Sequence, residues 1–195
     1  MRYDQDRKVR SRAIILDAGA RVFRRHGYRG ASVSKVMAEA GFTVGGFYAH
    51  FKDKDELYRK SFIHAVSESG HLLHEGIETL SRWDWVRAMA ERYLSDEHLQ
   101  MSDKGCPLPS LSSDVARDEA NAKSAFDDCL QLRLEQALEH FPESERDQAR
   151  EVVISVYCMG IGALSLARAY QSDDRRIEIL QAARSGISTL LEGRE

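Results

Sequence analysis

The stretch SVSKVMAEAGFTVGGFYAHF, residues 32–51, predicts two short helices joined by a tight turn. Apolar residues recur at helical spacing after Ser32, whose hydroxyl can accept a hydrogen bond from a free backbone N–H of the first turn. Gly41 stands where this first helix must end, because glycine adopts a left-handed backbone conformation at little cost. Thr43 can cap the second helix, which runs to about His50 and is expected to turn Val44, Phe47 and Phe51 inward.

Two short helices around a glycine turn form the helix-turn-helix pattern, whose second helix enters the major groove of DNA. The flanking sequence makes this interpretation specific. Residues 27–57, GYRGASVSKVMAEAGFTVGGFYAHFKDKDEL, resemble the N-terminal domain of the TetR/AcrR-family transcriptional repressors. The Gly-x-x-Gly-x-Ser opening, the Ala-Gly turn, the Phe-Tyr-x-His-Phe core and the Lys-x-Lys-x-x-Leu end all match in order.

This resemblance covers only the N-terminal part of the chain, and it implies an all-α fold of about nine helices. The implied domains are a three-helix helix-turn-helix DNA-binding domain at residues 1–54 and a helical effector-binding and dimerisation domain at residues 55–195. The implied partners are double-stranded operator DNA, a second copy of the chain and a small-molecule effector of unknown identity.

Charge is distributed unevenly along the 195 residues, which carry a net charge of −3. Residues 1–54 contain 12 Lys and Arg against 5 Asp and Glu, whereas the rest contains 16 against 26. A basic head on an acidic body suits a protein that presents one end to a polyanion. The alternative is chance segregation on solvated helices. Hydrophobic residues make up 43% and charged residues 30%, as in an ordinary soluble globular protein.

Helical periodicity also organises the remaining sequence. A first helix is expected from about residue 6 to residue 26, ended by Gly27, with an inward stripe of Ile14, Ile15, Ala18, Val22 and Phe23. A linking helix should follow from residue 53 or 54 to about residue 76, with Leu72 among its inward residues. Residues 95–109 contain Gly105, Pro107 and Pro109 and break the pattern. Further helices are expected at residues 81–94, 111–117, 118–141, 144–170 and 173–191.

By position in the motif, nine residues are expected to contact DNA: Ser32, Lys35, Thr43, Val44, Gly45, Gly46, Tyr48, His50 and Lys54. Hydroxyl groups can bond phosphate or base edges, and a valine can touch a thymine methyl. Lys54 resembles the phosphate-binding lysine of the family. Packing within the head is the alternative role for Tyr48 and His50. The basic residues Arg7, Lys8, Arg10 and Arg12 either lie along phosphates or form a solvated face.

The last two expected helices indicate dimerisation. Residues 152–167 leave little polar surface, and a helix that is apolar nearly all round must be covered on both sides. In the family that the chain resembles, the final two helices form a four-helix dimer interface. The residues assigned to this interface are Val152, Val156, Met159, Gly160, Ala163, Leu180 and Ile187. The alternative is a central helix buried within one monomer.

Aromatic residues of the body are candidates for an effector site, because family members usually bind a small molecule there. These are Trp83, Trp85, Tyr93, Phe126 and Tyr157, for which core packing is the alternative. Cys106 stands beside Lys104 in an irregular segment ahead of a short helix, a setting that can lower a thiol pKa and favour reaction with electrophiles. The alternative is a small buried residue.

Other function classes find little support. There is no Ser-His-Asp order, Gly-rich phosphate loop, HExxH or paired CxxC, so the chain is not expected to be an enzyme or to need a cofactor. His71 and His74 with Glu75 or Glu78 form only a weak metal pattern, and a solvated face is favoured. The remaining alternative is a helical protein-binding or nonspecific architectural DNA-binding module.

The sequence favours a location in the cytoplasm. The three cysteines lack paired spacing, which suits a reducing compartment, and the polar N-terminus shows no secretory signal. The longest apolar stretch, residues 152–167, contains Ser155 and Ser165 and is too short for a comfortable membrane span. No membrane association is therefore expected.

Overall fold

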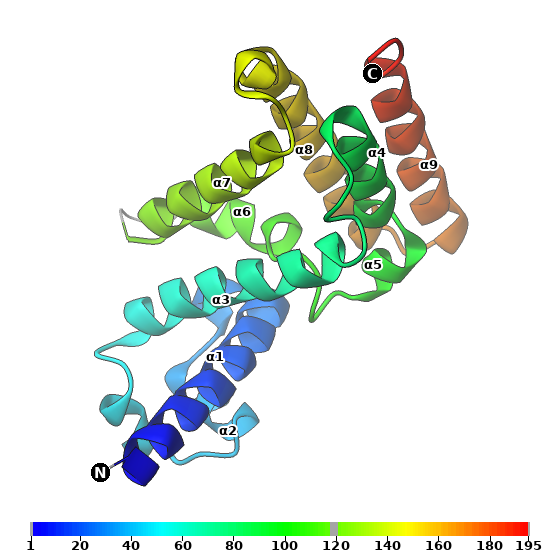
Figure 1. Cartoon of the computed structure of the whole chain (residues 1–195). Coiled ribbons are helices and arrows are strands. Elements are labelled where there is room, and N and C mark those ends of the chain that lie inside the picture. Colours follow the sequence, from blue (N-terminus) through cyan, green and yellow to red (C-terminus); the bar gives the residue numbers. More distant parts are fainter. Residues whose placement is uncertain (1, 118–120, 195) are drawn as a thin grey trace. The chain divides into compact units, whose positions relative to one another are not determined.

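The computed structural model describes residues 2–117 and 121–194, and within these ranges it contains helices and no strands, as the sequence predicts (Figure 1). Nine α-helices and two 3-10 helices occur in the described ranges. Their bounds are α1 Arg2–Gly30, α2 Val33–Glu39, η1 Val44–Ala49, α3 Lys54–His74, α4 Arg82–Tyr93, α5 Asp96–Gln100, α6 Leu108–Ala116, α7 Asn121–Glu139, η2 Glu143–Glu145, α8 Arg146–Ala169 and α9 Asp173–Leu190.

The chain forms two compact units. The first comprises Met1–Ser69 and Cys106–Asp128, and the second comprises Gly70–Gly105 and Cys129–Glu195. The division falls within α3 and within α7. The functional boundary after residue 54 stays a prediction.

An aromatic core holds the first unit together. The Phe23 ring of α1 lies edge-on to the Tyr58 ring of α3, with 4.8 Å between centroids, and both side chains are buried. Phe62 of α3 stacks on Phe126 of α7 at 6.0 Å. Rings of this size each remove a large apolar area from water, so their burial stabilises the unit.

α1 is interrupted near its end. Gly27 has φ 63° and ψ 177°, values outside the helical region, so the regular helix stops at this glycine as expected, although α1 resumes beyond it to Gly30. The same glycine makes a close approach to α6, because a Cβ atom at residue 27 would lie 2.3 Å from Oδ2 of Asp114. Only glycine fits this position, because it tolerates these backbone angles and has no Cβ atom to clash with Asp114.

The second unit is built from α4, α5, α8 and α9 with parts of α3 and α7. Its largest fully buried side chains include Trp85, Leu94, Leu164, Leu180 and Leu191. α4 approaches α8 closely at Gly160, where a Cβ atom would lie 3.2 Å from the Tyr93 ring. Buried residues of α8 and α9, among them Val153, Leu164 and Leu180, pack within this unit.

Arginines cap the carboxyl ends of helices in the second unit. The Arg184 guanidinium donates to the carbonyl of Leu94 at 2.8 Å, and Arg168 donates to the carbonyl of His98 at 2.9 Å. Arg87 donates to the carbonyl of Leu191 at 3.0 Å. The last carbonyls of a helix have no partner within it, so these contacts satisfy groups that would otherwise need water.

Several boundary expectations are wrong. Residues 95–109 are not irregular throughout: α5 begins after Ser95, whose hydroxyl accepts a hydrogen bond from the His98 N–H at 3.1 Å. α6 starts at Leu108 rather than at residue 111, because a proline in the first helical turn has no N–H that needs a partner. Ile14 is 45% exposed and Leu72 is 49% exposed, so neither lies in the core. The expected helix start at residue 118 lies outside the described residues.

The stretch Glu143–Ala169 is long and apolar enough, by length and composition, to cross a membrane, and 39% of its most apolar window is buried inside the protein. Its buried residues include Val153, Leu164 and Ala167, which belong to the hydrophobic core of the second unit. A core helix of a folded unit satisfies the same length and composition test.

Candidate DNA interface

The first helix of the predicted pair forms as expected. The Ser32 hydroxyl accepts a hydrogen bond from the Lys35 N–H at 3.2 Å and so caps α2. Val36 and Met37 are buried on the inner face of this helix. Gly41 follows with φ 76° and no atom within 4 Å of the position of a Cβ, so this glycine serves the turn and not a close contact.

The second helix of the pair, η1, is a 3-10 helix and not an α-helix. Gly45 and Gly46 are poor α-helix formers, and short helices often adopt the tighter 3-10 geometry. Thr43 makes no side-chain cap bond, contrary to expectation. Phe47 is buried as predicted, whereas Val44 stands at the open first position of the helix and is 46% exposed.

Exposed groups lie beside a buried anchor in η1. The Phe47 ring stacks on Phe51 at 5.7 Å between centroids, and both are almost completely buried. Tyr48 packs its ring edge-on against Phe47 at 5.1 Å but is 74% exposed. This arrangement fixes the helix through one face and leaves the Tyr48 hydroxyl and the Val44 methyl groups open to a partner.

All nine residues predicted to contact DNA belong to the first unit. Five are exposed, namely Lys35, Thr43, Val44, Gly45 and Tyr48, and four are half-buried, namely Ser32, Gly46, His50 and Lys54. Lys35 donates from Nζ to the Gly30 carbonyl at 2.9 Å. Their role in DNA contact stays a prediction.

Arg12 of α1 holds the end of η1. Its guanidinium donates to the carbonyl of His50, the C-cap residue of η1, and lies 4.3 Å above the Phe51 ring. A second nitrogen lies 3.6 Å from Glu56, which also accepts a hydrogen bond from the Lys52 N–H at 2.8 Å. From the sequence, Arg12 was one of four basic residues expected either to lie along phosphates or to form a solvated face. In the structure, its guanidinium stabilises the end of η1 and the turn into α3.

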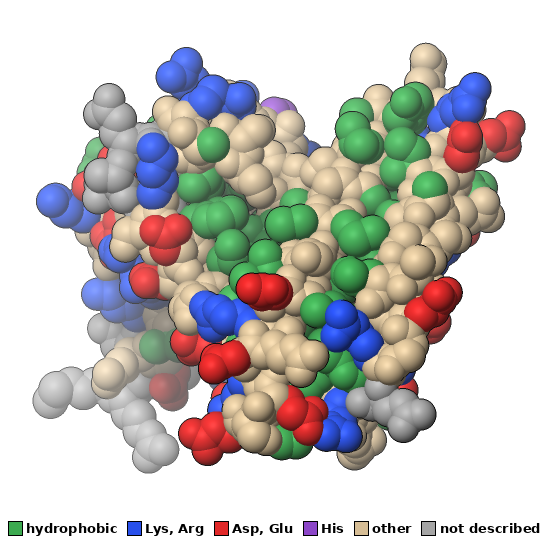
Figure 2. Space-filling view, turned by 90° about the horizontal axis from the view of Figure 1, so that it is seen from above, with side chains coloured by type: hydrophobic (Ala, Val, Ile, Leu, Met, Phe, Trp, Pro, Cys, Tyr) green, Lys and Arg blue, Asp and Glu red, His purple; other side chains and the backbone are tan. Residues whose placement is uncertain are grey.

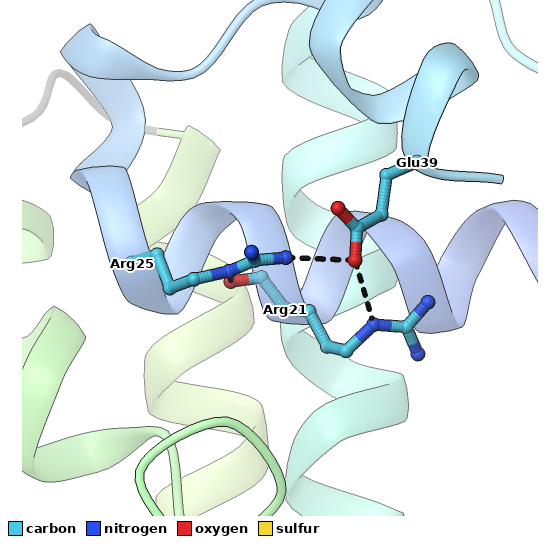
Figure 3. A network of polar contacts seen from close by, with 3 residues as sticks. All are labelled: Arg21, Arg25 and Glu39. Carbon is cyan, nitrogen blue, oxygen red and sulfur yellow. Dashed lines mark hydrogen bonds and ion pairs between the residues drawn. The ribbon is translucent and has the colours of Figure 1, made fainter.

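A carboxylate of α2 is held by two arginines of α1. Oε1 of Glu39 accepts from Arg25 at 2.7 Å and from Arg21 at 3.1 Å (Figure 3). Hydrogen bonds from Arg21 and then from Arg25 lower the pKa of Glu39. The three charges thereby anchor the end of α2 to α1. Sequence spacing gave no signal for this contact, since the partners are 14 and 18 residues apart.

Lys54 begins α3 and is placed over an aromatic ring. Its Nζ lies 4.2 Å from the centroid of Tyr28, whose hydroxyl donates to Asp55. Burial lowers the pKa of Lys54, and the neighbouring Asp55 opposes this effect. At His50, burial lowers the imidazole pKa first, and Lys8 and Arg12 add to the effect. Its Nδ1 atom is buried and has no hydrogen-bond partner.

The residues assigned to a dimer interface are largely covered within their own chain, and their role in dimerisation stays a prediction. Val152, Val156, Gly160, Ala163, Leu180 and Ile187 are buried inside the second unit, and Met159 packs partly buried against the same core. They have little surface left for a second subunit. The open face of α8 instead carries Ile154, Cys158, Gly162 and Leu166, all exposed at helical spacing.

An exposed apolar side chain also occurs on α9, where Ile177 is 38% exposed; Leu166 on the open face of α8 is 55% exposed. The space-filling view shows hydrophobic side chains open to solvent among charged ones on the face that it presents (Figure 2). Sequence periodicity missed the open stripe of α8 because the helix is apolar on both of its faces.

The aromatic residues proposed to line an effector site do not form one cluster within a unit. Phe126 belongs to the first unit, and the other four belong to the second. The Trp83 ring lies edge-on to Phe141 at 4.8 Å, and Tyr157 donates from its hydroxyl to the Arg133 carbonyl at 3.0 Å. Tyr93 lies edge-on to His98 at 4.8 Å. Each ring therefore makes packing contacts of its own. Cys106 is buried, with 7% of its surface exposed.

Trp85 lies in a cluster with two histidines. The His140 ring stacks on it at 4.4 Å, and the His74 ring lies edge-on at 5.3 Å. Burial, followed by the charges of Arg133, His140 and His71, lowers the pKa of His74 to about 4. Among the residues that the structure describes, no three His, Cys, Asp or Glu side chains come together in a way that could hold a metal ion.

Known proteins resemble this chain at two levels. Residues 15–60 match the family described as "Bacterial regulatory proteins, tetR family". The chain is 32% identical over 95 residues to the HTH-type transcriptional repressor AcnR of Corynebacterium efficiens, a match that covers 44% of this chain and 50% of the repressor. The chain thus spans about half the length of the curated relatives that it matches first.

Solved structures agree over nearly the whole chain. Reduced NemR of Escherichia coli has a TM-score of 0.75 at 18% identity and covers 92% of this chain and 95% of its own. FadR of Bacillus subtilis, solved in complex with stearoyl-CoA, has a TM-score of 0.67 at 16% identity and covers 93% and 98%. At these identities the likeness concerns the fold. The match of residues 15–60 to the tetR family and the fold shared over nearly the whole chain support a TetR/AcrR-family regulator.

Proposed function

We propose that the protein is a dimeric transcriptional repressor that binds a palindromic operator through α2 and η1. The observation that carries this proposal is the pairing in η1 of a buried anchor, Phe47, with a neighbouring Tyr48 that is 74% exposed. The Tyr48 ring packs against Phe47 but leaves most of its surface in solvent, and an exposed aromatic side chain on a firmly held short helix suits contact with a groove. The basic residues of the head supply the attraction to phosphate.

η1 and its N-cap residue present hydroxyl groups, backbone and methyl groups to DNA, and they contain no arginine, asparagine or glutamine side chain. Thr43 and Tyr48 can donate to phosphate or base, and Val44 can contact a thymine methyl. No side chain of η1 can make a bidentate contact to a base, so we expect the sequence-dependent shape of the duplex to contribute to the choice of operator. Gly45 and Gly46 allow the backbone to come close to the groove wall.

The experiment is a mobility shift on the DNA that flanks the protein's own coding region. A specific repressor gives one or two discrete retarded species at low protein concentration, whereas a nonspecific architectural protein smears fragments of every sequence. Tyr48→Phe removes only the hydroxyl and should weaken operator binding while dimerisation stays intact. Lys54→Ala should weaken binding to all sequences and reduce the salt slope by about one phosphate's share. Unchanged operator affinity in both variants would show that Tyr48 and Lys54 do not contribute to the DNA interface.

A second subunit would cover the open face of α8. From residue 152 to residue 167 this helix carries no charged side chain, and its exposed members include Ile154 and Leu166. Ile154→Arg should convert the dimer to a monomer in sedimentation or light-scattering measurements. Leu132→Arg is the matched control, because Leu132 is 54% exposed on α7 and lies outside α8. If both variants and the wild type have equal masses, the open face of α8 is not the dimer interface.

Release from DNA would follow binding of a small molecule in the second unit or reaction of a thiol. The stearoyl-CoA held by the similarly folded FadR supports a ligand of amphipathic character. The electrophile alternative requires Cys106, which is buried and must become accessible first. If Cys106→Ser loses operator DNA upon N-ethylmaleimide treatment as the wild type does, the thiol is not the sensor. No turnover is expected in a broad panel of enzyme substrates.

A further inference from the structure

Tyr28 joins three parts of the first unit. Its backbone N–H donates to Oδ2 of Asp114 on α6 at 3.0 Å, and its hydroxyl donates to Asp55 on α3. The Lys54 ammonium group lies over its ring, 4.2 Å from the centroid. One residue, placed just after the break in α1, therefore contacts both α6 and the first turn of α3.

The position of the Tyr28 ring is closely determined. Gly27 adopts φ 63° and ψ 177°, which turns the chain so that the next N–H meets Asp114. The Tyr58 ring, which is 2% exposed, makes an edge-to-face contact with the Tyr28 ring at 5.1 Å between centroids. A ring held from its backbone, its hydroxyl and its edge presents a fixed face to Lys54.

We propose that Tyr28 is a positioning residue, which holds Lys54 ready for a phosphate, and that Asp114 of α6 holds Tyr28 in place. The proposal rests on the DNA binding proposed above. A lysine side chain has many rotamers, and ordering it before DNA arrives reduces the entropy lost on binding. The π face of a tyrosine attracts an ammonium group without neutralising it, so the charge stays available to phosphate.

The proposal gives α6 an influence on DNA affinity without any contact to DNA. Asp114 uses one carboxylate oxygen for the Tyr28 N–H and the other for Arg117, at 3.0 Å. Arg117 is 65% exposed, so the inner hydrogen bond and the outer ion pair can be separated by mutation. A displacement of α6 would withdraw Asp114 from Tyr28 and loosen Lys54.

The test combines NMR of the free protein with DNA titrations by fluorescence anisotropy at several salt concentrations. The Lys54 side-chain protons should show upfield ring-current shifts in the wild type and in Tyr28→Phe, and these shifts should vanish in Tyr28→Leu and shrink in Asp114→Ala. Operator affinity should fall about fivefold per head in Tyr28→Leu, the size of an exposed cation–π contact. Arg117→Ala should leave both readouts unchanged.

A double-mutant cycle separates positioning from general loosening of the head. If Tyr28 acts through Lys54, Tyr28→Leu has no further effect on affinity in the Lys54→Ala background. Additive losses, or a Tyr28→Leu variant that binds as tightly as the wild type, would overturn the positioning role and leave the proposed function standing. Failure of the wild-type protein to bind any flanking fragment would overturn the proposed function, and the DNA role of Tyr28 with it.

Discussion

Replacement of Gly27 by alanine tests whether the break in α1 is required by the fold. The backbone angles at Gly27, φ 63° and ψ 177°, are strained for any residue with a Cβ, at a cost of about 1–3 kcal/mol. The new Cβ would also lie 2.3 Å from Asp114 and displace its carboxylate from the Tyr28 N–H. A charge-assisted hydrogen bond contributes about 1.5–3 kcal/mol. The expected loss of unfolding free energy is on the order of 4 kcal/mol.

Denaturant unfolding followed by circular dichroism measures this loss, and Gly41→Ala is the matched control. Gly41 also has a positive φ, 76°, but nothing lies within 4 Å of its Cβ position, so only backbone strain of about 1–2 kcal/mol is expected there. The double variant Gly27→Ala/Asp114→Ala should lose less unfolding free energy than the sum of the two single changes, because Gly27→Ala already displaces the hydrogen bond and Asp114→Ala removes the clash. A Gly27→Ala protein no less stable than Gly41→Ala would show that the close approach of Gly27 to Asp114 does not limit the fold.

Three further predictions concern single side chains. Ser32→Ala should destabilise the protein by about 1 kcal/mol in denaturant unfolding, since Ser32 caps α2, whereas Thr43→Ala should cost little because Thr43 makes no cap bond. In the unfolded chain a histidine has a pKa of about 6.5, whereas in the folded protein the pKa of His74 is about 4. Between these two pH values the unfolded chain binds more protons, so the unfolding free energy should fall as the pH drops from about 6.5 to about 4. Below pH about 4 the contribution of His74 should level off. His74→Gln should flatten that dependence in pH-dependent unfolding, and His71→Gln, on an exposed residue of the same helix, should not. Glu39→Gln should destabilise the protein by about 0.5–1 kcal/mol at neutral pH in low salt and by less in high salt; equal losses in both would argue against an electrostatic anchor.

Local features of the head could be predicted because each depends on neighbouring residues. The Ser32 cap, the Gly41 turn and the inward Phe47 and Phe51 follow from spacing and backbone preference alone. The all-α fold followed from the same periodicity and from the resemblance in residues 27–57. α5 was missed although Ser95 is a good N-cap residue, because Gly105 and the two prolines after it dominated the pattern.

Contacts between distant parts of the chain could not be predicted in this way. Arg12 meets His50 across 38 residues, and the Tyr28 N–H meets Asp114 across 86. Sequence spacing carries no signal for pairs of this kind, since their approach depends on how the helices pack. The open face of α8 was hidden for a related reason: hydrophobicity marks both faces of the helix, and only packing decides which one is covered.

Hydroxyl-radical footprinting on the operator fragment shows whether η1 contacts DNA as part of a two-fold dimer. Two protected segments related by two-fold symmetry are expected, with centres separated by a whole number of helical turns of about 10–10.5 base pairs each. Protection should disappear from both segments together in the Ile154→Arg variant. A single unpaired protected segment, or uniform weak protection of every fragment, would contradict operator binding as a two-fold dimer.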